Sequence, residues 1–459
     1  MEDPRELALL TDLYELTMAQ AYFQAGRDES ATFSLFVRGN IKNRGYYVAA
    51  GLEDALDFLA ALAFDGASID YLRSTRIFAD DFLDYLKTLR FTGSVRGLPE
   101  GRLFFADEPI LEVTAPIIEA QIVETFLINQ INLQSMIATK AARCVAAAGG
   151  RGVVDFALRR THGIDAGMKV ARASYIAGCA GTSNVLAGKR YAIPVVGTMA
   201  HSFVSSFERE IDAFRAYAQS FPDGCVLLLD TYDTIAGAKN AVAIAHELAA
   251  RGKKLRGARI DSGDLAVLAR EVRRIFDDAG FPEVQLIASG GLDEYDIAEF
   301  TAKNLPFNAY GVGTQMGTSG DQPWLDTAYK LVAAGGRPVL KLSRGKASMP
   351  GAKQIFRRRE GDRLKNDVVG LADEKLEGEP LLQTVMENGR VKGPHPALAE
   401  IRERFRADFA LLDDGVKAVR APRRFPVEIS AELRRLRART VRRVRERIDG
   451  LTLGNPHGR

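Results

Sequence analysis

The stretch Ala192-Ile193-Pro194-Val195-Val196-Gly197-Thr198-Met199-Ala200-His201-Ser202-Phe203 joins a short apolar run to a loop and then to an amphipathic segment. This order predicts a buried strand, a loop and a helix, which is the unit of parallel α/β sheets. His201 lies on the loop and is one of only five histidines in the chain. An isolated histidine there is often a capping or core residue. Because its charge and nucleophilicity are tuned near neutral pH, His201 is also a candidate nucleophile or acid/base.

The alternation of strand and helix continues along the middle of the chain. Short apolar strands are expected at residues 152–155, 193–196, 225–229, 258–260, 284–288 and 308–312. Helices are expected at residues 166–178, 203–220, 234–251, 265–279 and 293–303. Polar residues lie at nearly every strand's carboxyl end, namely Asp155, His201, Asp230, Asp261, Ser289 and Thr314. Because that edge carries the chemistry of βα barrels, the pattern favours a barrel over an open sheet, where such groups would gather at one switch point.

The outer segments have a different pattern. Helices are expected at residues 13–25, 53–62 and 124–148, a strand at 31–38, and a hairpin from 328–332 and 339–342. We therefore predict an α/β protein in which residues 136–325 form an irregular βα barrel domain. The N-terminal segment 1–135 and the C-terminal segment 326–459 would together form an α+β domain. Residues 431–448 carry eight arginines, and their apolar spacing predicts an amphipathic helix with a solvated basic face.

Composition excludes several classes of protein. The 459 residues are 46% hydrophobic and 26% charged, which is ordinary for a globular chain with large cores. The net charge of +3 does not indicate a nucleic-acid-binding protein. Three widely spaced cysteines without a CxxC pattern favour a reduced setting and no structural zinc. Because the N-terminus is polar, we expect no signal peptide, and because no long apolar run occurs, we expect no membrane span. We therefore expect a cytoplasmic protein.

Two glycine-containing turns follow consecutive predicted strands. The first is Ser289-Gly290-Gly291 (the 289–291 loop), which precedes a helix, and the second is Gly311-Val312-Gly313-Thr314 (the 311–314 loop). Small residues let backbone amides approach an anion closely, and a helix N-terminus adds favourable partial charge. Each turn alone is weak as a signal. Two in succession, late in a barrel, predict a phosphate site.

Charged residues also end two of the strands. Asp230 and Asp261 are candidates to bind Mg²⁺ or sugar hydroxyls, whereas Asp233 and Asp264 are expected to be helix N-caps. Arg259 ends an apolar strand, where an unpaired guanidinium is costly, so it requires an anion. That anion is either Asp261 or a substrate carboxylate.

An aromatic ring follows the first barrel strand. Phe156 comes directly after Asp155, and Arg159 and Arg160 follow closely. A phenylalanine in this place is most often part of the core. It is also suited to stack a flat ring, with an arginine nearby for a carboxylate.

Taken together, these segments resemble the nicotinate phosphoribosyltransferase family. The similarity is carried by segments at residues 10–18, 33–38, 138–143, 181–187, 197–203, 259–265, 310–314 and 341–354. It is specific because many independent segments occur in order over roughly residues 8–355, and it is faint beyond about residue 360. The resemblance implies a barrel-like phosphoribosyltransferase domain, an α+β domain, and a homodimer with shared active sites. It implies the joining of nicotinate to 5-phosphoribosyl 1-diphosphate, with Mg²⁺ as cofactor and ATP as co-substrate.

The resemblance also implies residue roles. His201 would be phosphorylated by ATP, and Tyr14 of a neighbouring subunit and Phe156 would sandwich the pyridine ring. Thr198 and Arg259 would contact nicotinate, and Asp230 and Asp261 would position the ribose or Mg²⁺. The phosphate contacts implied are Ser289, Gly290, Gly291, Gly313 and Thr314, with Arg38, Lys140 and Lys341 on the diphosphate.

The choice of pyridine depends on Ser183. Relatives that use the amide carry an acidic residue where this chain has Ser183, and an aspartate there would repel a carboxylate. Ser183 with Arg259 therefore favours nicotinate over nicotinamide. The alternatives are a nicotinamide or a quinolinate phosphoribosyltransferase, although quinolinate should demand a denser basic cluster. A non-catalytic regulatory protein with a phosphate pocket is the alternative from another class.

Overall fold

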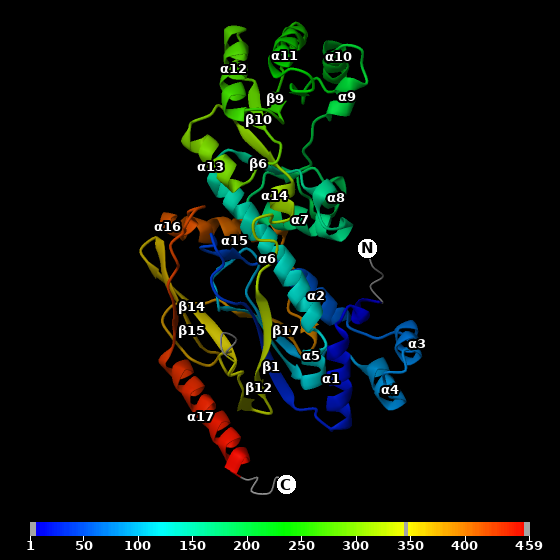
Figure 1. The fold of residues 1–459 in the computed structure, drawn as a ribbon, viewed down its shortest axis with the longest axis vertical. Helices are drawn as coiled ribbons and strands as arrows, with labels where there is room; N and C mark the ends of the chain where they lie inside the picture. The colour runs from blue at the N-terminus through cyan, green and yellow to red at the C-terminus, as the bar shows by residue number, and fades with distance from the viewer. Residues whose placement is uncertain (1–5, 344–347, 454–459) are drawn as a thin grey trace. The chain divides into compact units, whose positions relative to one another are not determined.

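The computed structural model describes residues 6–343 and 348–453, called the described residues below. Residues 1–5, on which the expectation of no signal peptide depends, lie outside them. The chain divides into two compact units, one formed by Met1–Ser135 with Trp324–Arg459 and the other by Met136–Pro323. The first boundary falls within the long helix α6 (Glu124–Ala147), which Figure 1 shows in cyan.

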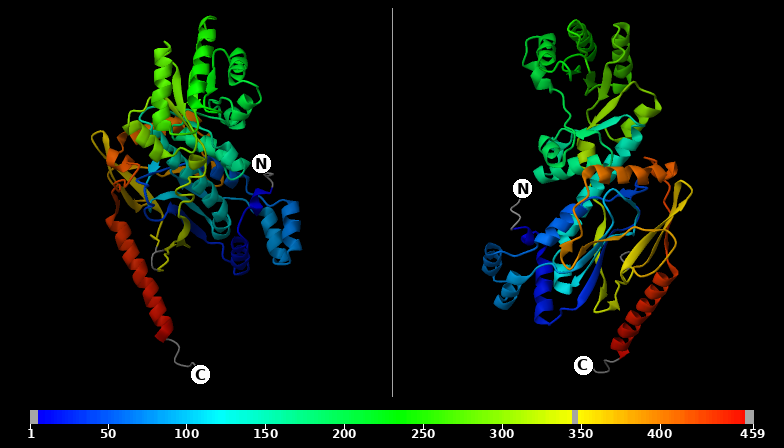
Figure 2. Two further views of the ribbon diagram at one scale, coloured as in Figure 1. Left: turned by 45° about the horizontal axis from the view of Figure 1, so that its top comes forward. Right: turned by 180° about the vertical axis from the view of Figure 1, so that it is seen from behind.

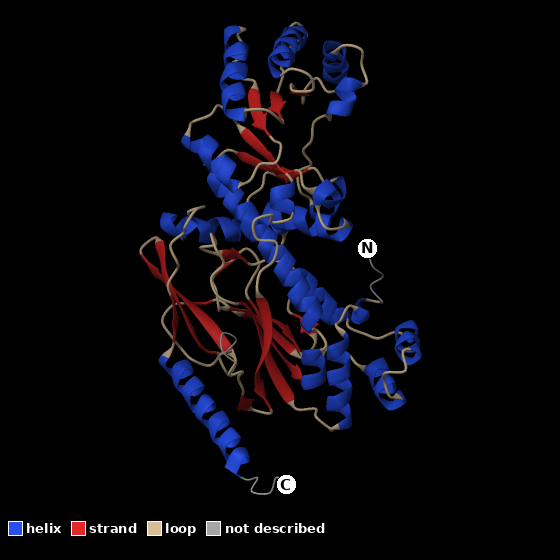
Figure 3. Ribbon diagram, viewed as in Figure 1, coloured by secondary structure: helices blue, strands red, loops and turns tan. Residues whose placement is uncertain are grey.

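The second unit is built on a six-stranded parallel sheet with helices around it (Figure 3). The strand order is β7-β6-β11-β10-β9-β8. The strands are β6 (Gly152–Asp155), β7 (Gly181–Thr182), β8 (Val226–Leu228), β9 (Gly257–Ile260), β10 (Gln285–Ala288) and β11 (Ala309–Val312). The longer helices are α7 (Ile164–Ile176), α8 (Val185–Tyr191), α10 (Glu210–Ser220), α11 (Thr234–Ala249), α12 (Leu265–Asp278) and α13 (Glu294–Ala302). The short ones are α9 (His201–Ser205), α14 (Thr314–Gly317) and the 3₁₀ turn Leu158–Arg160.

The α/β fold class is confirmed, and the sheet is half of a barrel. The strand predicted at 193–196 is wrong, because Val195 forms only an isolated bridge with Thr182. Pro194 has no N–H to donate, which limits this segment as a strand. The single helix predicted over 203–220 is instead two, α9 and α10. Helices α10, α11 and α12 pack side by side in this order (Figure 2).

Aspartate caps begin the helices that follow the strands. Asp233 Oδ1 accepts a hydrogen bond from the Ala236 amide at 2.7 Å, and Asp264 does so from the Ala266 amide at 3.0 Å. Both predicted N-caps are confirmed. Asp293 caps α13 in a reciprocal capping box with Asp296. Such caps satisfy amides at the helix start and fix where each helix leaves its loop.

The first unit contains two main sheets. One has seven strands in the order β13-β12-β1-β5-β3-β17-β18, the other has four in the order β16-β14-β15-β19, and β2 pairs with β4. Strands of the seven-stranded sheet are β1 (Ser30–Val37), β3 (Ser94–Gly97), β5 (Pro109–Pro116), β12 (Thr327–Ala334), β13 (Arg337–Pro338), β17 (Gln383–Glu387) and β18 (Arg390–Val391). The others are β2 (Tyr47–Val48), β4 (Leu103–Phe104), β14 (Lys353–Glu360), β15 (Arg363–Leu371), β16 (Glu379–Pro380) and β19 (Val427–Ile429).

Both ends of the chain contribute to the seven-stranded sheet. β1 pairs antiparallel with β12, joining segments about three hundred residues apart, for example Leu35 with Tyr329. The first arm of the predicted hairpin is present in β12, but its partner is the short β13 at Arg337–Pro338, and the strand predicted at 339–342 is wrong. The helices are the 3₁₀ turn Leu7–Leu9, α1 (Leu13–Gln24), α2 (Leu52–Ala61), α3 (Gly66–Ser74), α4 (Asp80–Thr88), α5 (Ile117–Gln121), α15 (Leu398–Leu411), α16 (Asp414–Lys417) and α17 (Ala431–Leu453). The arginine-rich segment is α17, which contacts β15. No helix among the described residues is long and apolar enough to cross a membrane.

Candidate active site

A cavity of about 460 Å³ opens at the carboxyl ends of the parallel strands in the second unit. Most of the predicted substrate residues of this unit line it, as expected from the end of the sheet that they follow. The lining residues are Phe156, Arg159, Arg160, Ser183, Gly197, Thr198, Met199, Ala200, His201, Arg259, Asp261, Ser289, Gly290, Gly291, Gly311, Gly313 and Thr314. The structure thus brings residues from six separate segments of the chain around one space.

His201 stands at the wall of this cavity as the first residue of α9. Its Nδ1 lies 3.2 Å from the Thr231 hydroxyl, and its Nε2 lies 3.9 Å from Asp261 Oδ2. The side chain is 44% exposed, so it is not a buried core histidine. One ring nitrogen is therefore anchored while the other faces a carboxylate and remains open to a ligand.

Arg259 on β9 is the buried cation of the cavity, with its side chain 11% exposed. Its Nη1 donates to Asp261 Oδ1 at 2.7 Å, and its Nη2 donates to the Met199 carbonyl at 2.8 Å. Burial lowers its pKa, and Asp261 and Asp230 oppose that shift. Its Nε is buried without a hydrogen-bond partner in the described part of the chain. Such an orphaned donor costs about 1–3 kcal/mol, which a bound anion would relieve.

Asp230 lies behind this wall rather than on it. Its Oδ2 accepts hydrogen bonds from the Asp261 amide at 3.0 Å and from the Ser262 hydroxyl, so it holds the turn that carries Asp261. Its Oδ1 is buried and has no partner among the described residues. No group of three or more histidine, cysteine or acidic side chains suited to a metal occurs within the described ranges. Mg²⁺ needs only one or two carboxylates when substrate oxygens complete its shell, so the free Oδ1 of Asp230 fits that ion.

The 289–291 loop packs directly against the Asp261 backbone. A Cβ on Gly290 would lie 1.8 Å from the Asp261 carbonyl oxygen, and the φ of Gly290 is +96°. Only glycine combines this conformation with so close an approach. Ser289 donates to Asp261 Oδ1, so the loop and the carboxylate form one connected wall.

Phe156 projects its ring against another glycine. A Cβ on Gly311 would lie 2.5 Å from ring atoms Cδ2 and Cε2 of Phe156. Gly311, Arg159 and Arg160 also line the cavity. The sequence placed Gly311 in a phosphate turn and the two arginines near Phe156, but the resemblance implied no contact for any of them. The signal that the sequence offers for Gly311 is a glycine inside a predicted strand, which often marks a close approach of another group.

Ser183 and Asp155 are hydrogen-bonded through their backbones but have different roles in the site. Ser183 and Thr198 line the cavity, and the Ser183 amide donates to the Asp155 carbonyl at 2.8 Å. The Asp155 carboxylate accepts from the Thr182 hydroxyl at 2.7 Å and from the Ala157 amide at 2.8 Å. Burial raises the pKa of Asp155. Asp155 therefore braces the turn that carries Phe156 and does not reach the cavity.

Four predicted contacts lie elsewhere. Lys140 is fully buried in the second unit and pairs with Glu294 and Asp321, so it does not line the cavity. Tyr14, Arg38 and Lys341 belong to the first unit. Tyr14 is 45% exposed on α1, and burial together with nearby carboxylates raises its pKa. Arg38 lies 3.4 Å from Asp326, and Lys341 is exposed.

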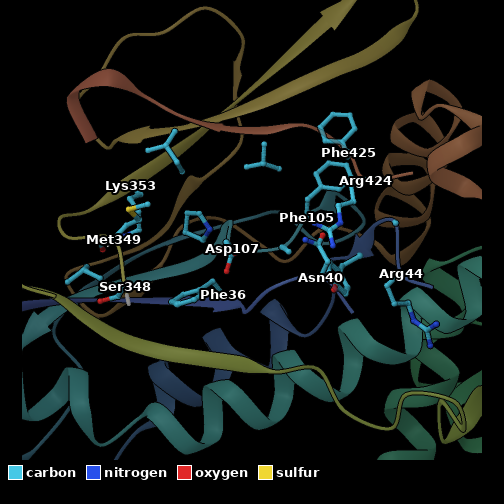
Figure 4. Close-up of a pocket in the computed structure, with 17 residues that line it drawn as sticks. Phe36, Asn40, Arg44, Phe105, Asp107, Ser348, Met349, Lys353, Arg424 and Phe425 are labelled. Carbon is cyan, nitrogen blue, oxygen red and sulfur yellow. Dashed lines mark hydrogen bonds between the residues drawn. The ribbon is translucent and has the colours of Figure 1, made fainter. Parts of the chain in front are cut away.

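A second cavity, of about 420 Å³, lies in the first unit and is lined by residues of both sheets (Figure 4). The rings of Phe105 and Phe425 stack there with centroids 3.9 Å apart. The Nζ atom of Lys353 donates to the Gly351 carbonyl at 2.7 Å and lies 3.3 Å from a Glu112 carboxylate oxygen. Burial lowers the pKa of Lys353. None of the described residues that line this cavity is a predicted site residue.

Comparison with known proteins places the chain in one family. Models for the N-terminal domain, the family as a whole and the C-terminal domain of nicotinate phosphoribosyltransferase match residues 9–132, 152–368 and 352–437. The chain is 47% identical over 436 residues to nicotinate phosphoribosyltransferase pncB2 of Mycobacterium tuberculosis, covering 94% of both chains. It is 37% identical over 476 residues to the nicotinate phosphoribosyltransferase of Bacillus subtilis, covering 96% of this chain and 97% of that one.

Solved structures agree with this assignment. The human nicotinic acid phosphoribosyltransferase superposes with a TM-score of 0.84 at 31% identity, covering 94% of this chain and 99% of the human one. The nicotinate-nucleotide pyrophosphorylase of Pyrococcus furiosus superposes with a TM-score of 0.73 at 25% identity, covering 89% and 98%. The resemblance first seen in short motifs is confirmed along nearly the whole length. The chain belongs to the nicotinate phosphoribosyltransferase family.

Proposed function

We propose that this protein joins nicotinate to 5-phosphoribosyl 1-diphosphate, giving nicotinate mononucleotide and diphosphate for NAD salvage in the cytoplasm. The observation that carries the proposal is the orphaned Nε of Arg259, a buried cation donor on the wall of the cavity. A pyridine carboxylate is an anion of the right charge and size to satisfy it. Family membership and the two glycine-containing loops around the cavity indicate the second substrate, 5-phosphoribosyl 1-diphosphate.

Nicotinate would lie with its ring on Phe156 and its carboxylate toward Arg259. Gly311 leaves room for the Phe156 ring in its present position. Ser183, on the same wall, offers a neutral hydroxyl where an acidic residue would repel the carboxylate. Arg259 and Ser183 select the acid over the amide, because the ring of Phe156 stacks equally well on either pyridine.

The ribose 5-phosphate would be held by backbone amides of the 289–291 loop and by Thr314 of the 311–314 loop. Both loops precede helices, α13 and α14, and both line the cavity. As the bond between ribose and diphosphate breaks, the ribose gains positive charge, which Asp261 is placed to stabilise. The departing diphosphate would meet Arg159 and Arg160, which line the cavity. Mg²⁺, held by substrate oxygens with the carboxylates of Asp261 and Asp230 nearby, would neutralise the diphosphate charge.

ATP would be coupled through His201. In the tautomer that carries its proton on Nδ1, this N–H donates a hydrogen bond to Thr231 Oγ1, 3.2 Å away, and the lone pair of Nε2 is free to attack the γ-phosphorus of ATP. An N–P bond forms, the bond between γ-phosphorus and the bridging oxygen breaks, and ADP leaves with that electron pair. Water later hydrolyses the phosphohistidine to inorganic phosphate. The contact with Thr231 holds the imidazole in this orientation.

We further propose a homodimer in which Tyr14 of a second copy completes the nicotinate pocket. Tyr14 is a large aromatic residue that stays 45% exposed on α1. Its ring would cover the face of the pyridine opposite Phe156. Sedimentation of the purified protein should show a dimer, and Tyr14→Ala should raise the KM for nicotinate without altering the free energy of unfolding.

The function is tested by offering nicotinate, nicotinamide and quinolinate separately with phosphoribosyl diphosphate and Mg²⁺, each with and without ATP. We expect product from nicotinate alone, increased by ATP with release of ADP. Product from nicotinamide would contradict the role given to Ser183 and Arg259. Product from quinolinate without ATP would place the chemistry in the decarboxylating branch. Absence of any product with donor still bound would contradict catalysis altogether.

A further inference from the structure

A cluster of buried charged side chains lies within the second unit, outside the cavity. Lys140 and Arg143 lie one turn apart on α6, Glu294 is the first residue of α13, and Asp321 follows α14. The side chains of Lys140 and Glu294 are 0% exposed and that of Arg143 is 1% exposed. Burying charged groups this completely costs free energy unless each group is paired.

Lys140 is the centre of the cluster. Its Nζ is paired with Glu294 and lies 2.8 Å from Asp321 Oδ1. Arg143 Nε donates to Glu294 Oε1 at 2.9 Å, and the Tyr295 ring lies 5.9 Å from Lys140 Nζ. Burial would lower the pKa of Lys140, but Glu294 and Asp321 outweigh it and the pKa is raised, so the ammonium stays charged.

One arm of the cluster reaches the 289–291 loop. Glu294 follows Gly291 by three residues, and the capping box between Asp293 and Asp296 locks the first turn of α13. Asp293 Oδ1 accepts from the Tyr295 amide at 2.7 Å and from the Asp296 amide at 3.1 Å. Holding Glu294 therefore holds the end of the loop.

The other arm reaches the 311–314 loop. Asp321 follows Thr314 by seven residues, and the segment between them is bonded to itself. The Gly317 amide donates to the Gly313 carbonyl at 2.9 Å, and the Gly320 amide donates to the Gln315 carbonyl at 3.0 Å. Asp321 and Thr314 thus belong to one small rigid segment. A single ammonium group holds both loops through their carboxylates.

We propose that Lys140 is a positioning residue that fixes the separation of the 289–291 and 311–314 loops, so that both present donors to the same phosphate group. It acts from behind the loops and does not touch diphosphate. This inference rests on the proposed function only in assigning a phosphate to these two loops. Without Lys140, Glu294 and Asp321 would face each other as like charges and push the loops apart.

The test measures binding of ribose 5-phosphate by calorimetry, together with the KM values for both substrates. Lys140→Met should weaken ribose 5-phosphate binding and raise the KM for phosphoribosyl diphosphate by roughly ten- to hundred-fold, while the KM for nicotinate stays unchanged. Adding Asp321→Asn to Lys140→Met removes the repulsion and should restore a large part of the binding. Such recovery in a double-mutant cycle is not expected of a residue that contacts diphosphate.

Arg215→Met is the matched control, because Arg215 pairs with Glu247 in the same unit, 2.7 Å apart, away from the cavity lining. It should leave ribose 5-phosphate binding unchanged. If Lys140→Met fails to fold, Asp321→Asn alone, at a 28% exposed side chain, should still weaken binding. Equal loss for both substrates, or no recovery in the double variant, would overturn the proposal. Intact ribose 5-phosphate binding without turnover of nicotinate would overturn the proposed function alone, and absence of that binding in the unaltered protein would overturn both.

Discussion

Gly290→Ala is the substitution whose effect follows most directly from the geometry of the site. The added Cβ would lie 1.8 Å from the Asp261 carbonyl oxygen, a backbone atom that no side-chain rotation can move. The φ of +96° at Gly290 adds strain for any L-residue. Gly291 is the matched control, because its φ is +72° but nothing lies within 4 Å of its Cβ position.

The two variants separate strain from overlap. The positive φ costs about 1–2 kcal/mol in either variant. Overlap with the Asp261 backbone adds about 1–3 kcal/mol in Gly290→Ala only, in the range found for overpacked sites. We therefore expect the free energy of unfolding to fall by about 1–2 kcal/mol in Gly291→Ala and by about 2–5 kcal/mol in Gly290→Ala.

Urea denaturation followed by circular dichroism measures both values, and steady-state kinetics measures the effect on the site. Because Asp261 binds Arg259 and Ser289, Gly290→Ala should also lower kcat/KM far more than Gly291→Ala does. Equal stability of the two variants would refute the packing of this loop against Asp261, and so would equal activity.

Three further predictions concern charge and protonation. His201→Ala should abolish ADP release and the stimulation by ATP while changing the free energy of unfolding by less than about 0.5 kcal/mol, because the side chain is 44% exposed; ATP-stimulated turnover in this variant would disprove the phosphohistidine. Ser183→Asp should shift the ratio of kcat/KM from nicotinate toward nicotinamide, and an unchanged ratio would count against its placement at the carboxylate. Burial raises the pKa of Cys225 from 9.0 to about 12, so between these pH values the unfolded chain binds fewer protons than the folded one and stability falls as pH rises. Cys225→Ala should make that fall shallower by up to about 1.4 kcal/mol per pH unit in urea titrations, and identical slopes would be inconsistent with a buried neutral thiol.

Local sequence patterns predicted most strands and helices of the second unit. β6 spans Gly152–Asp155 as expected, and α11 and α12 begin at Thr234 and Leu265 behind their predicted aspartate caps. These predictions succeeded because short apolar runs and helix caps are encoded within a few residues. The break between α9 and α10 was missed because neither glycine nor proline marks residues 206–209.

Sequence patterns predicted residues that line the cavity where a polar or charged side chain comes at or directly after the end of a strand. His201, Arg259, Asp261 and Ser289 were found in this way, and all line one cavity. The resemblance to the family implied that Lys140 contacts diphosphate. Its carboxylate partner Asp321 is 181 residues away, and Arg143 meets Glu294 across 151 residues. Pairing over such distances depends on the fold and has no local signal.

The most direct test of the central claim compares nicotinate and nicotinamide as substrates of the unaltered protein and of Arg259→Met. Loss of a hydrogen bond to a charged group costs about 1.5–3 kcal/mol, so the preference for nicotinate should fall by roughly ten- to hundred-fold. The ratio of kcat/KM values isolates this effect, because any disturbance of Asp261 acts on both pyridines alike. A preference unchanged by Arg259→Met would contradict the claim that this arginine holds the nicotinate carboxylate.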